Sequence, residues 1–590
     1  MRPRQILFPL RLSTGEPSDC NAVPAVKSSI TSVSCEAQYG STPNGTLPYS
    51  NGAAGIGAYY AQLFSKMSIN TNDFAAYCHN VWYSIDLCRS KGETTDMTRS
   101  VCSEPPLIGI EESMYFTPKP ASADAALPPS GKNLNVLHLS DYHIDPRYDI
   151  GSEANCTSHL CCRPDAVNNV LHTNAQSPSL PASRFGALQC DSPPDLALSA
   201  FQSMPQFFDI SNISFSIYTG DIVSHDKDDQ LSQAYIEYEE TIAYDTFKAA
   251  LDNAPIYATL GNHDSFPQAL NTPNSLAPTN ALSWNYELLA SLWQNASWLN
   301  ASEAQYAATH YGAFAVTTPQ GLRVISLNTD FWYKANIFNH YNTTNPDQSG
   351  ILSFLAAELL ACEARNQRAW IIGHVLSGYD GSNPLPNPTA LFYSIVARFA
   401  PKTIALIAFG HTHEDQKQIY YDFLPNSTYI IDGRTYRNTT MVDYNKPIAV
   451  AYIGPSVVPL TNLNAGYTMY QVDDLTFEIM GSQVYFANIS NSLTWTTPEW
   501  NFEYDTRTAY TPVISGGWPA TAPLNATFWH KVTEAMLENT SVAQMYSTYE
   551  TKSSVVTPAC DTGECARRKV CYIRSGSAAL GRACPRVPSS

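Results

Sequence analysis

The sequence predicts an α/β fold with a central, largely covered sheet. From residue 133 onward, short apolar runs alternate with longer stretches of helical periodicity. The composition is that of a globular chain, with 44% hydrophobic and 15% charged residues. The predicted buried strands are NVLHLSD at 135–141, ISFSIYTGD at 213–221, PIYATLGNHD at 255–264, LRVISLNTD at 322–330, AWIIGH at 369–374 and TIALIAFGHTH at 403–413, and the predicted helices between them span 232–251 and 350–367.

The region before residue 133 differs in composition, which indicates a separate module. At 590 residues the chain is long enough for two or three domains. Residues 1–104 contain five cysteines and a helix-like stretch at 53–67, and predict a small disulfide-stapled helical segment. Residues 105–132 are rich in proline and predict an extended linker. The start, MRPRQILFPLRLSTG, has a short, interrupted apolar core, so we expect either a true start elsewhere or an unusual route of export.

Net charge, cysteine content and glycosylation sequons limit which partners the protein can bind and indicate the cellular compartment in which it works. The 34 basic and 52 acidic side chains give a net charge of −18, which argues against nucleic acid as a partner. Fourteen cysteines and eleven Asn-x-Ser/Thr sequons indicate a disulfide-bonded glycoprotein. We therefore expect a protein that is secreted or resides in a lysosome- or vacuole-like lumen. No apolar run reaches the roughly eighteen residues of a membrane span, so no transmembrane segment is predicted.

Polar side chains follow most of the predicted strands where they end. In α/β sheets, ligands bind beyond the carboxyl ends of the strands, so these side chains should converge on one site. They are Asp141, His143, Asp221, His225, Asn262, His263, His374, His411 and His413. One such residue alone is more often part of a turn or a helix cap. Five strand ends of this kind on one chain favour a metal site over five unrelated turns.

The number of candidate ligands fits two metal ions. We expect Asp141, His143 and His413 to hold one ion and Asn262, His374 and His411 the other, with Asp221 bridging both. A bridged pair about 3.5–4 Å apart can bind a hydroxide and clamp a phosphoryl group for in-line attack. The imidazole ligands favour zinc over manganese or iron.

Five motifs, SDYH, TGDIVSHD, GNHD, IIGH and FGHTHED, resemble in this order those of the calcineurin-like metallophosphoesterases. Within that superfamily, DYHIDPRYDIGSEANCTSHLCCR, TGDIVSHD, FGHTHEDQ and NAGYTMYQVD are closely similar to the acid sphingomyelinases. The likeness extends from about residue 133 to the C-terminus.

The resemblance implies a four-layer fold of two mixed sheets flanked by helices, with a catalytic domain at 133–494 and a helical C-terminal region at 495–590. It implies hydrolysis of sphingomyelin to ceramide and phosphocholine by two Zn²⁺ ions and a metal-bound hydroxide, in peripheral contact with membrane lipid. The metal ligands it implies are Asp141, His143, Asp221, Asn262, His374, His411 and His413, with His225 and His263 as the two catalytic, non-ligand histidines. The disulfides it implies are Cys156–Cys161, Cys162–Cys190, Cys560–Cys565 and Cys571–Cys584.

A general acid is expected as well, because the primary alkoxide of ceramide, with a conjugate-acid pKa of roughly 16, leaves slowly without a proton. His263 directly follows the predicted ligand Asn262, and His225 lies four residues beyond Asp221. Both side chains can therefore lie next to the site without coordinating a metal. Asp264 is expected to hold His263 in its protonated form. The alternative is that each histidine only forms a hydrogen bond to a loop and has no catalytic role.

Two features of the chain depart from the acid sphingomyelinases. Their N-terminal saposin-like domain has six cysteines, whereas residues 1–104 have five at different spacing, so this segment is at most a divergent form of that domain. The stretch VLSGYD after His374 lacks their proline-rich, cysteine-containing continuation, so no disulfide is expected there. Cys362 lies on a helical pattern and is expected to be buried rather than reactive.

Two other functions stay open. The chain could hydrolyse nucleotides or other soluble phosphodiesters, because relatives with the same metal motifs do so. It could also be a non-catalytic lipid-binding glycoprotein, against which the retention of every ligand argues. A purple acid phosphatase is disfavoured, because the chain reads IVSHDKDD after Asp221, where that family has an iron-binding tyrosine.

Overall fold

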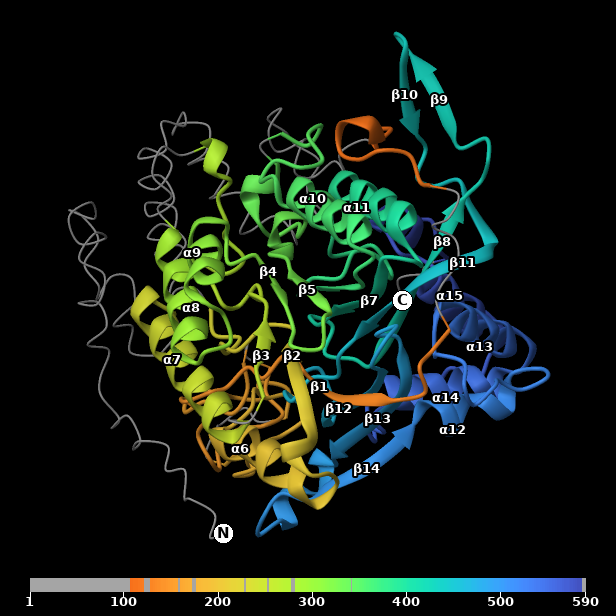
Figure 1. The fold of residues 1–590 in the computed structure, drawn as a ribbon. Helices are drawn as coiled ribbons and strands as arrows, with labels where there is room; N and C mark the ends of the chain where they lie inside the picture. Colours follow the sequence, from red (N-terminus) through yellow and green to blue (C-terminus); the bar gives the residue numbers. More distant parts are fainter. Residues whose placement is uncertain are drawn as a thin grey trace.

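The computed structural model describes residues 107–120, 128–157, 160–171, 177–227, 230–251, 254–276, 282–340 and 342–585. The predicted N-terminal segment, residues 1–104, lies outside the described residues. Two six-stranded mixed sheets pack together, and helices flank them (Figure 1). This arrangement confirms the α/β class and the four layers.

The first sheet has the strand order β14-β13-β12-β1-β2-β3. Its strands are β1 (Asn133–Leu139), β2 (Ile213–Tyr218), β3 (Ile256–Ala258), β12 (Ala465–Asp473), β13 (Ile479–Ala487) and β14 (Trp500–Asp505). β1, β2 and β3 are parallel, and β12 to β14 add antiparallel neighbours. The carboxyl ends of the three parallel strands therefore lie at one edge of the sheet.

The second sheet has the order β4-β5-β6-β7-β11-β8. Its strands are β4 (Phe314–Thr317), β5 (Arg323–Ser326), β6 (Ala369–Ile372), β7 (Ile404–Phe409), β8 (Gln416–Phe423) and β11 (Val442–Ile453). β5, β6, β7 and β11 are parallel, with β4 and β8 antiparallel at the edges. The six strands predicted from the sequence are all present, three in each sheet.

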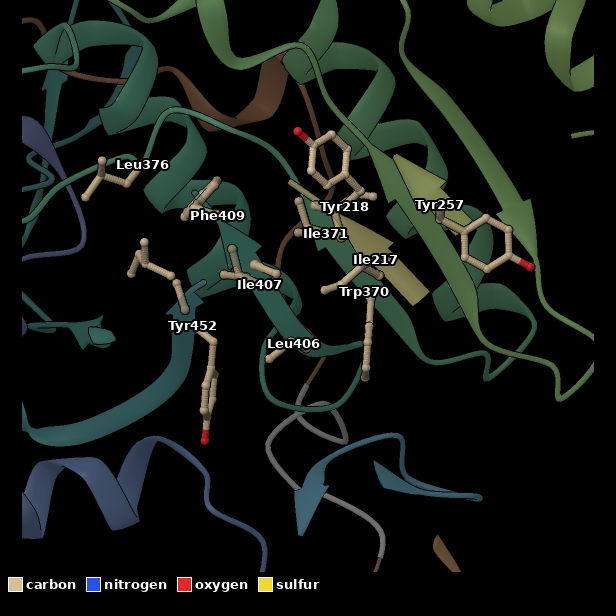
Figure 2. Packing of buried hydrophobic residues seen from close by; sticks show 14 of the residues in the cluster. Ile217, Tyr218, Tyr257, Trp370, Ile371, Leu376, Leu406, Ile407, Phe409 and Tyr452 are labelled. Carbon is tan, nitrogen blue, oxygen red and sulfur yellow. The ribbon is translucent and has the colours of Figure 1, made fainter. Parts of the chain in front are cut away.

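The two sheets meet in an apolar core. Figure 2 shows labelled core residues from β2 and β3 of the first sheet and from β6, β7 and β11 of the second. Trp370 of β6 packs edge-on against Phe215 of β2, with ring centroids 5.4 Å apart, and donates its indole N–H to the carbonyl of Phe477. The hydroxyl of Ser326 in β5 donates to the carbonyl of Ala258 in β3 at 2.9 Å. These contacts fix the relative position of the two carboxyl edges.

Helices form the outer layers. They are α6 (Pro194–Ser203), α7 (Gln233–Ala250), α8 (Ser283–Asn295), α9 (Ala301–Thr309), α10 (Ile351–Ala364) and α11 (Pro386–Phe399). Phe247 of α7 packs on Tyr218 of β2, with centroids 5.1 Å apart, while α10 and α11 contact the second sheet. α7 and α10 confirm the two helices predicted at 232–251 and 350–367.

The C-terminal region is helical, as predicted, with α12 (Thr506–Tyr510), α13 (Ala526–Glu538), α14 (Thr540–Glu550), α15 (Gly563–Ile573) and α16 (Ala578–Arg582). α13 and α15 lie against β8 of the second sheet (Figure 1). The domain boundary at 494/495 stays a prediction, and the first sheet continues beyond it into β14.

All four implied disulfides are formed, at Cys156–Cys161, Cys162–Cys190, Cys560–Cys565 and Cys571–Cys584. Cys362 is a buried free thiol, as expected.

Part of the predicted linker lies on the surface of the α/β domain. Ile110 forms an antiparallel bridge to Arg437 in β10 (Arg434–Arg437), which pairs with β9 (Thr428–Ile431). Phe116 packs edge-on against Phe399 of α11 at 6.0 Å. Across the described ranges, no helix has both the length and the apolar character needed to cross a membrane.

Candidate metal centre

The residues predicted as metal ligands come together where strands of both sheets end. Asp141 and His143 follow β1, Asp221 follows β2, and Asn262 follows β3 in the first sheet. His374 follows β6, and His411 and His413 follow β7 in the second sheet. All seven are buried except His411, which is partly exposed. The site therefore lies on the shared edge of the two sheets.

The backbone at these positions is strained. Five of the seven residues have a left-handed backbone, namely Asp141 (φ 49°), His143 (φ 38°), Asp221 (φ 66°), His411 (φ 76°) and His413 (φ 64°). Non-glycine residues rarely adopt positive φ, and such conformations cost of order 1–3 kcal/mol each. Strain repeated at five converging positions is typical of a functional site.

Two glycines let the strand-end loops approach one another. A Cβ at Gly261 would lie 2.1 Å from Oδ1 of Asp221, and a Cβ at Gly410 would lie 2.3 Å from the hydroxyl of Ser140. Neither position can hold a larger residue without moving a neighbouring loop. The glycines in GNHD and FGHTHED therefore serve the close packing of the site.

Asp141, His143 and His413 form what we call the first ligand group. Nδ1 of His143 donates to the carbonyl of Val223 at 2.7 Å, which directs its Nε2 toward the site. That Nε2 lies 3.2 Å from Nε2 of His413, 3.3 Å from Oδ2 of Asp221 and 3.9 Å from Oδ1 of Asp141. Nε2 of His413 lies 3.6 Å from the same Asp141 oxygen.

Asn262, His374 and His411 form the second ligand group. Nδ1 of His374 donates to the carbonyl of Thr219 at 2.7 Å, so its Nε2 also points into the site. Nε2 of His374 lies 2.9 Å from Oδ1 of Asn262 and 3.1 Å from Oδ2 of Asp221. Nδ1 of His411 lies 2.7 Å from the same Asn262 oxygen. Oδ2 of Asp221 thus faces both groups.

This donor set fits a metal centre. A backbone carbonyl fixes the Nδ1 proton of His143 and of His374, so each Nε2 faces carboxylate, amide or imidazole acceptors. Such converging acceptors need a shared cation or proton. The carboxylates supply a matching negative potential: Asp221 raises the pKa of His143 to about 9 and that of His374 to about 10, although burial acts in the opposite direction. The same potential attracts a divalent cation, which competes with protons for these nitrogens.

Two further histidines lie beside the first ligand group. The ring of His225 lies 3.8 Å from that of His143 and 4.3 Å from that of His263, measured between centroids. Nε2 of His263 lies 2.9 Å from the Nε2 amide of Gln268. The amide donates, so the proton of the neutral ring is on Nδ1. Within the described residues, this Nδ1 is buried without a hydrogen-bond partner.

Asp191 was not singled out from the sequence, yet it holds His225. Its Oδ1 accepts from Nδ1 of His225 at 2.7 Å, and its Oδ2 accepts from the His225 backbone N–H at 2.6 Å. Burial opposes its ionisation, but the His225 charge and these hydrogen bonds lower the pKa of Asp191 below its ordinary value. Its position directly after Cys190, at the end of a predicted disulfide, was the only available signal.

The expectation that Asp264 keeps His263 protonated is wrong. Both oxygens of Asp264 accept backbone N–H groups, from Asp221, Ile222 and Gly261 at 2.6–2.9 Å. Asp264 therefore ties the loop after β3 to the loop after β2 and does not serve the imidazole. Burial, reinforced by His225, lowers the pKa of His263 well below its ordinary value. Adjacent residues in a tight turn point in different directions, which the sequence reasoning did not take into account.

Comparison with known proteins agrees with this geometry. Residues 134–415 match the family model described as calcineurin-like phosphoesterase. The chain is 28% identical over 439 residues to sphingomyelin phosphodiesterase 2 of Caenorhabditis elegans, covering 71% of this chain and 65% of that protein. It is 30% identical over 423 residues to sphingomyelin phosphodiesterase of Homo sapiens, covering 70% and 59%. The match thus spans less than two thirds of the length of either relative.

A third relative is named for a different activity. The chain is 28% identical over 381 residues to a cyclic GMP-AMP phosphodiesterase of Homo sapiens, covering 62% of this chain and 73% of that protein. The relatives thus include enzymes named for a lipid substrate and one named for a nucleotide substrate.

Proposed function

We propose that this chain, which matches the calcineurin-like phosphoesterase family over residues 134–415 and is similar to sphingomyelin phosphodiesterases, is a phosphoric diester hydrolase that cleaves sphingomyelin to ceramide and phosphocholine. The observation that carries the proposal is the convergence of seven ligand side chains from five strand ends on one partly open site. The names of the relatives support the lipid substrate.

Two zinc ions fit the donor set. The first ligand group would hold one ion, the second group the other, and Asp221 would contact both. Imidazole nitrogens with few carboxylates are typical zinc ligands. Such a pair of ions would polarise the phosphoryl oxygens and lower the pKa of an attacking water.

His225 is the better placed of the two histidines to donate a proton to the leaving group. Asp191 accepts its Nδ1–H and would stabilise positive charge on the ring, while 22% of the His225 side chain is exposed. This arrangement resembles the orienting carboxylate of other catalytic histidines.

His263 suits a second role. Its buried Nδ1–H can donate to a phosphoryl oxygen while the ring stays neutral. Together the two histidines would hold the phosphodiester and protonate the departing alkoxide.

We further propose that the protein works in a secreted or lumenal setting as a glycoprotein. The four disulfides in the described part of the chain need an oxidising compartment. Residues 1–104 would present lipid to the site, as a divergent saposin-like segment in peripheral contact with membranes.

The cyclic GMP-AMP phosphodiesterase among the relatives supports a second candidate, hydrolysis of nucleotides or other soluble phosphodiesters. The third, a non-catalytic lipid-binding glycoprotein, has less support, because the side chains of all seven predicted ligands converge.

Turnover measurements on the purified full chain separate these functions. Zinc-loaded protein at acid pH is compared on sphingomyelin in detergent micelles and on cyclic GMP-AMP, with Asp221→Asn as the inactive control. We expect faster turnover of sphingomyelin, abolished by a chelator and restored by zinc. Faster turnover of the nucleotide would support the second candidate, and no turnover by folded, zinc-loaded protein would support the third.

A further inference from the structure

A lysine of the C-terminal region reaches the back of the metal centre. Lys552 follows α14 and is completely buried. Its Nζ donates to the carbonyl of His413 at 2.7 Å, to the hydroxyl of Ser456 at 2.9 Å and to the carbonyl of Ser456 at 3.3 Å. The Ser456 hydroxyl donates its own hydrogen bond to the carbonyl of Val458 at 2.6 Å, so it accepts the hydrogen bond from Nζ. Three acceptors thus surround the Lys552 amino group.

The loop that Lys552 contacts also holds the other end of the first ligand group. The backbone N–H of Ser456 donates to the carbonyl of His413 at 3.2 Å, and that of Val458 donates to the carbonyl of Asp141 at 3.0 Å. Residues 456–458 therefore join the two strand ends that carry Asp141 and His413. Lys552 binds this loop and His413 at the same time.

The fold maintains this contact at a cost. Lys552 has a left-handed backbone with φ 55°, and its carbonyl is held by the side-chain amide of Asn464 at 2.8 Å. In the part of the chain that the structure describes, Lys552 forms no ion pair. Burial lowers the pKa of Lys552 to about 7, with the carboxylates of Glu414, Glu503, Asp141 and Asp415 acting in the opposite direction, so the hydrogen bonds of Nζ must offset a large desolvation cost. A strained, buried lysine in contact with a predicted ligand loop points to a role in the site.

We propose that Lys552 is a positioning residue for the first ligand group, through which the C-terminal region completes the metal centre. The Lys552 amino group fixes the His413 peptide and the 456–458 loop, and thereby the distance between His413 and Asp141. This inference rests on the proposed function, because it takes Asp141, His143 and His413 as ligands of one ion.

Metal binding by the full-length variant Lys552→Met tests the inference. Methionine keeps most of the side-chain length but donates no hydrogen bond. Apo protein is titrated with Zn²⁺ against a competing chelator, and with Co²⁺ while its visible absorption is recorded. Loss of groups that orient metal ligands typically weakens affinity about 10–100-fold. We expect a loss of that size for one of the two ions, with the other changed less than about threefold.

Arg507→Met is the matched control. Arg507 is also a cation of the C-terminal region that donates to backbone carbonyls, those of Met480, Pro519 and Ala522, and none of these belongs to a ligand loop. We expect Arg507→Met to lower thermal stability while both ions keep their wild-type affinity. Ser456→Ala removes one acceptor of Lys552 and should weaken the same ion by a smaller factor.

Two results would overturn the inference. One is wild-type affinity for both ions in Lys552→Met, and the other is an equal weakening of both ions, matched by Arg507→Met. If Lys552→Met does not fold, unchanged affinity in Ser456→Ala is the overturning result. Wild-type protein that binds no zinc would instead contradict the proposed function itself, so the two failures can be told apart.

Discussion

The two ligand groups have similar donor atoms but different supports. The second group is fixed from within the α/β domain, by the Thr219 carbonyl on Nδ1 of His374 and by the Thr329 hydroxyl, which accepts the backbone N–H of His374 at 3.0 Å. The first group is fixed in part from outside, by Lys552 on the carbonyl of His413. We therefore expect the C-terminal region to matter for the ion proposed at the first group and not for the ion proposed at the second.

Asp221→Asn should have the largest effect, because Asp221 is the one predicted ligand that faces both groups. Its Oδ2 lies 3.3 Å from His143 and 3.1 Å from His374. We expect sphingomyelin turnover to fall by at least about 10³-fold and both ions to bind more weakly, since the loss of one charge affects both positions. Turnover and zinc affinity are measured on the same folded sample. Near wild-type turnover would show that the two groups do not form one binuclear centre.

Asp191→Asn should affect proton transfer and leave both groups loaded. The variant keeps the size of the side chain but cannot stabilise positive charge on His225. Turnover of sphingomyelin should fall by about 10²–10⁴-fold, the usual contribution of a general acid. A nitrophenyl phosphodiester should lose far less, because nitrophenolate leaves without a proton. If His263→Ala shows this substrate dependence and Asp191→Asn does not, the acid is His263 and our assignment of the two histidines is reversed.

Thr329→Val is the counterpart of Lys552→Met for the second group. The Thr329 hydroxyl accepts the backbone N–H of His374 at 3.0 Å and that of Val375 at 2.7 Å, and valine has the same shape without the acceptor. We expect one ion to bind about 10–100-fold more weakly. In cobalt spectra the ion that is lost should differ from the one lost in Lys552→Met. The same spectral change in both variants would remove the distinction between the groups.

The smallest expected effect concerns a buried carboxyl group outside both ligand groups, and it appears in the pH dependence of stability. Glu240 of α7 is fully buried, and in the described structure neither carboxyl oxygen has a hydrogen-bond partner. Burial raises the pKa of Glu240 well above its ordinary value, with the carboxylates of Asp264, Glu237 and Glu239 adding to the effect. The folded state therefore retains a proton that the unfolded state loses. This contribution to stability is full at acid pH and declines as pH rises toward the raised pKa.

The melting temperature should therefore be higher at pH 5 than at pH 7.5, and Glu240→Gln should reduce that difference by on the order of a few °C. Calorimetry of metal-free protein at the two pH values measures this difference in melting temperature without a contribution from metal binding. An unchanged pH dependence in Glu240→Gln would show that Glu240 is already ionised in the folded state.

The sequence was most informative where function depends on strand ends. Apolar runs that stop in Asp, Asn or His predicted both the sheets and the converging ligands. Asp191 and Lys552 were not predicted, because the first lies 34 residues from His225 and the second 139 residues from His413. Their roles depend on tertiary contacts that no local pattern encodes. Asp264 illustrates the opposite case: it is adjacent to His263 in the sequence, yet its carboxylate does not contact the His263 ring.

The central claim is that the two ligand groups hold two ions joined by Asp221. Anomalous diffraction at the zinc absorption edge, from crystals of the full chain grown with zinc, tests it directly. We predict two peaks, each about 2.0–2.1 Å from its imidazole nitrogens. One should contact Nε2 of His143 and of His413, the other Nε2 of His374 and Nδ1 of His411, with Asp221 reaching both. A single peak, or two peaks that do not share Asp221, would contradict the account.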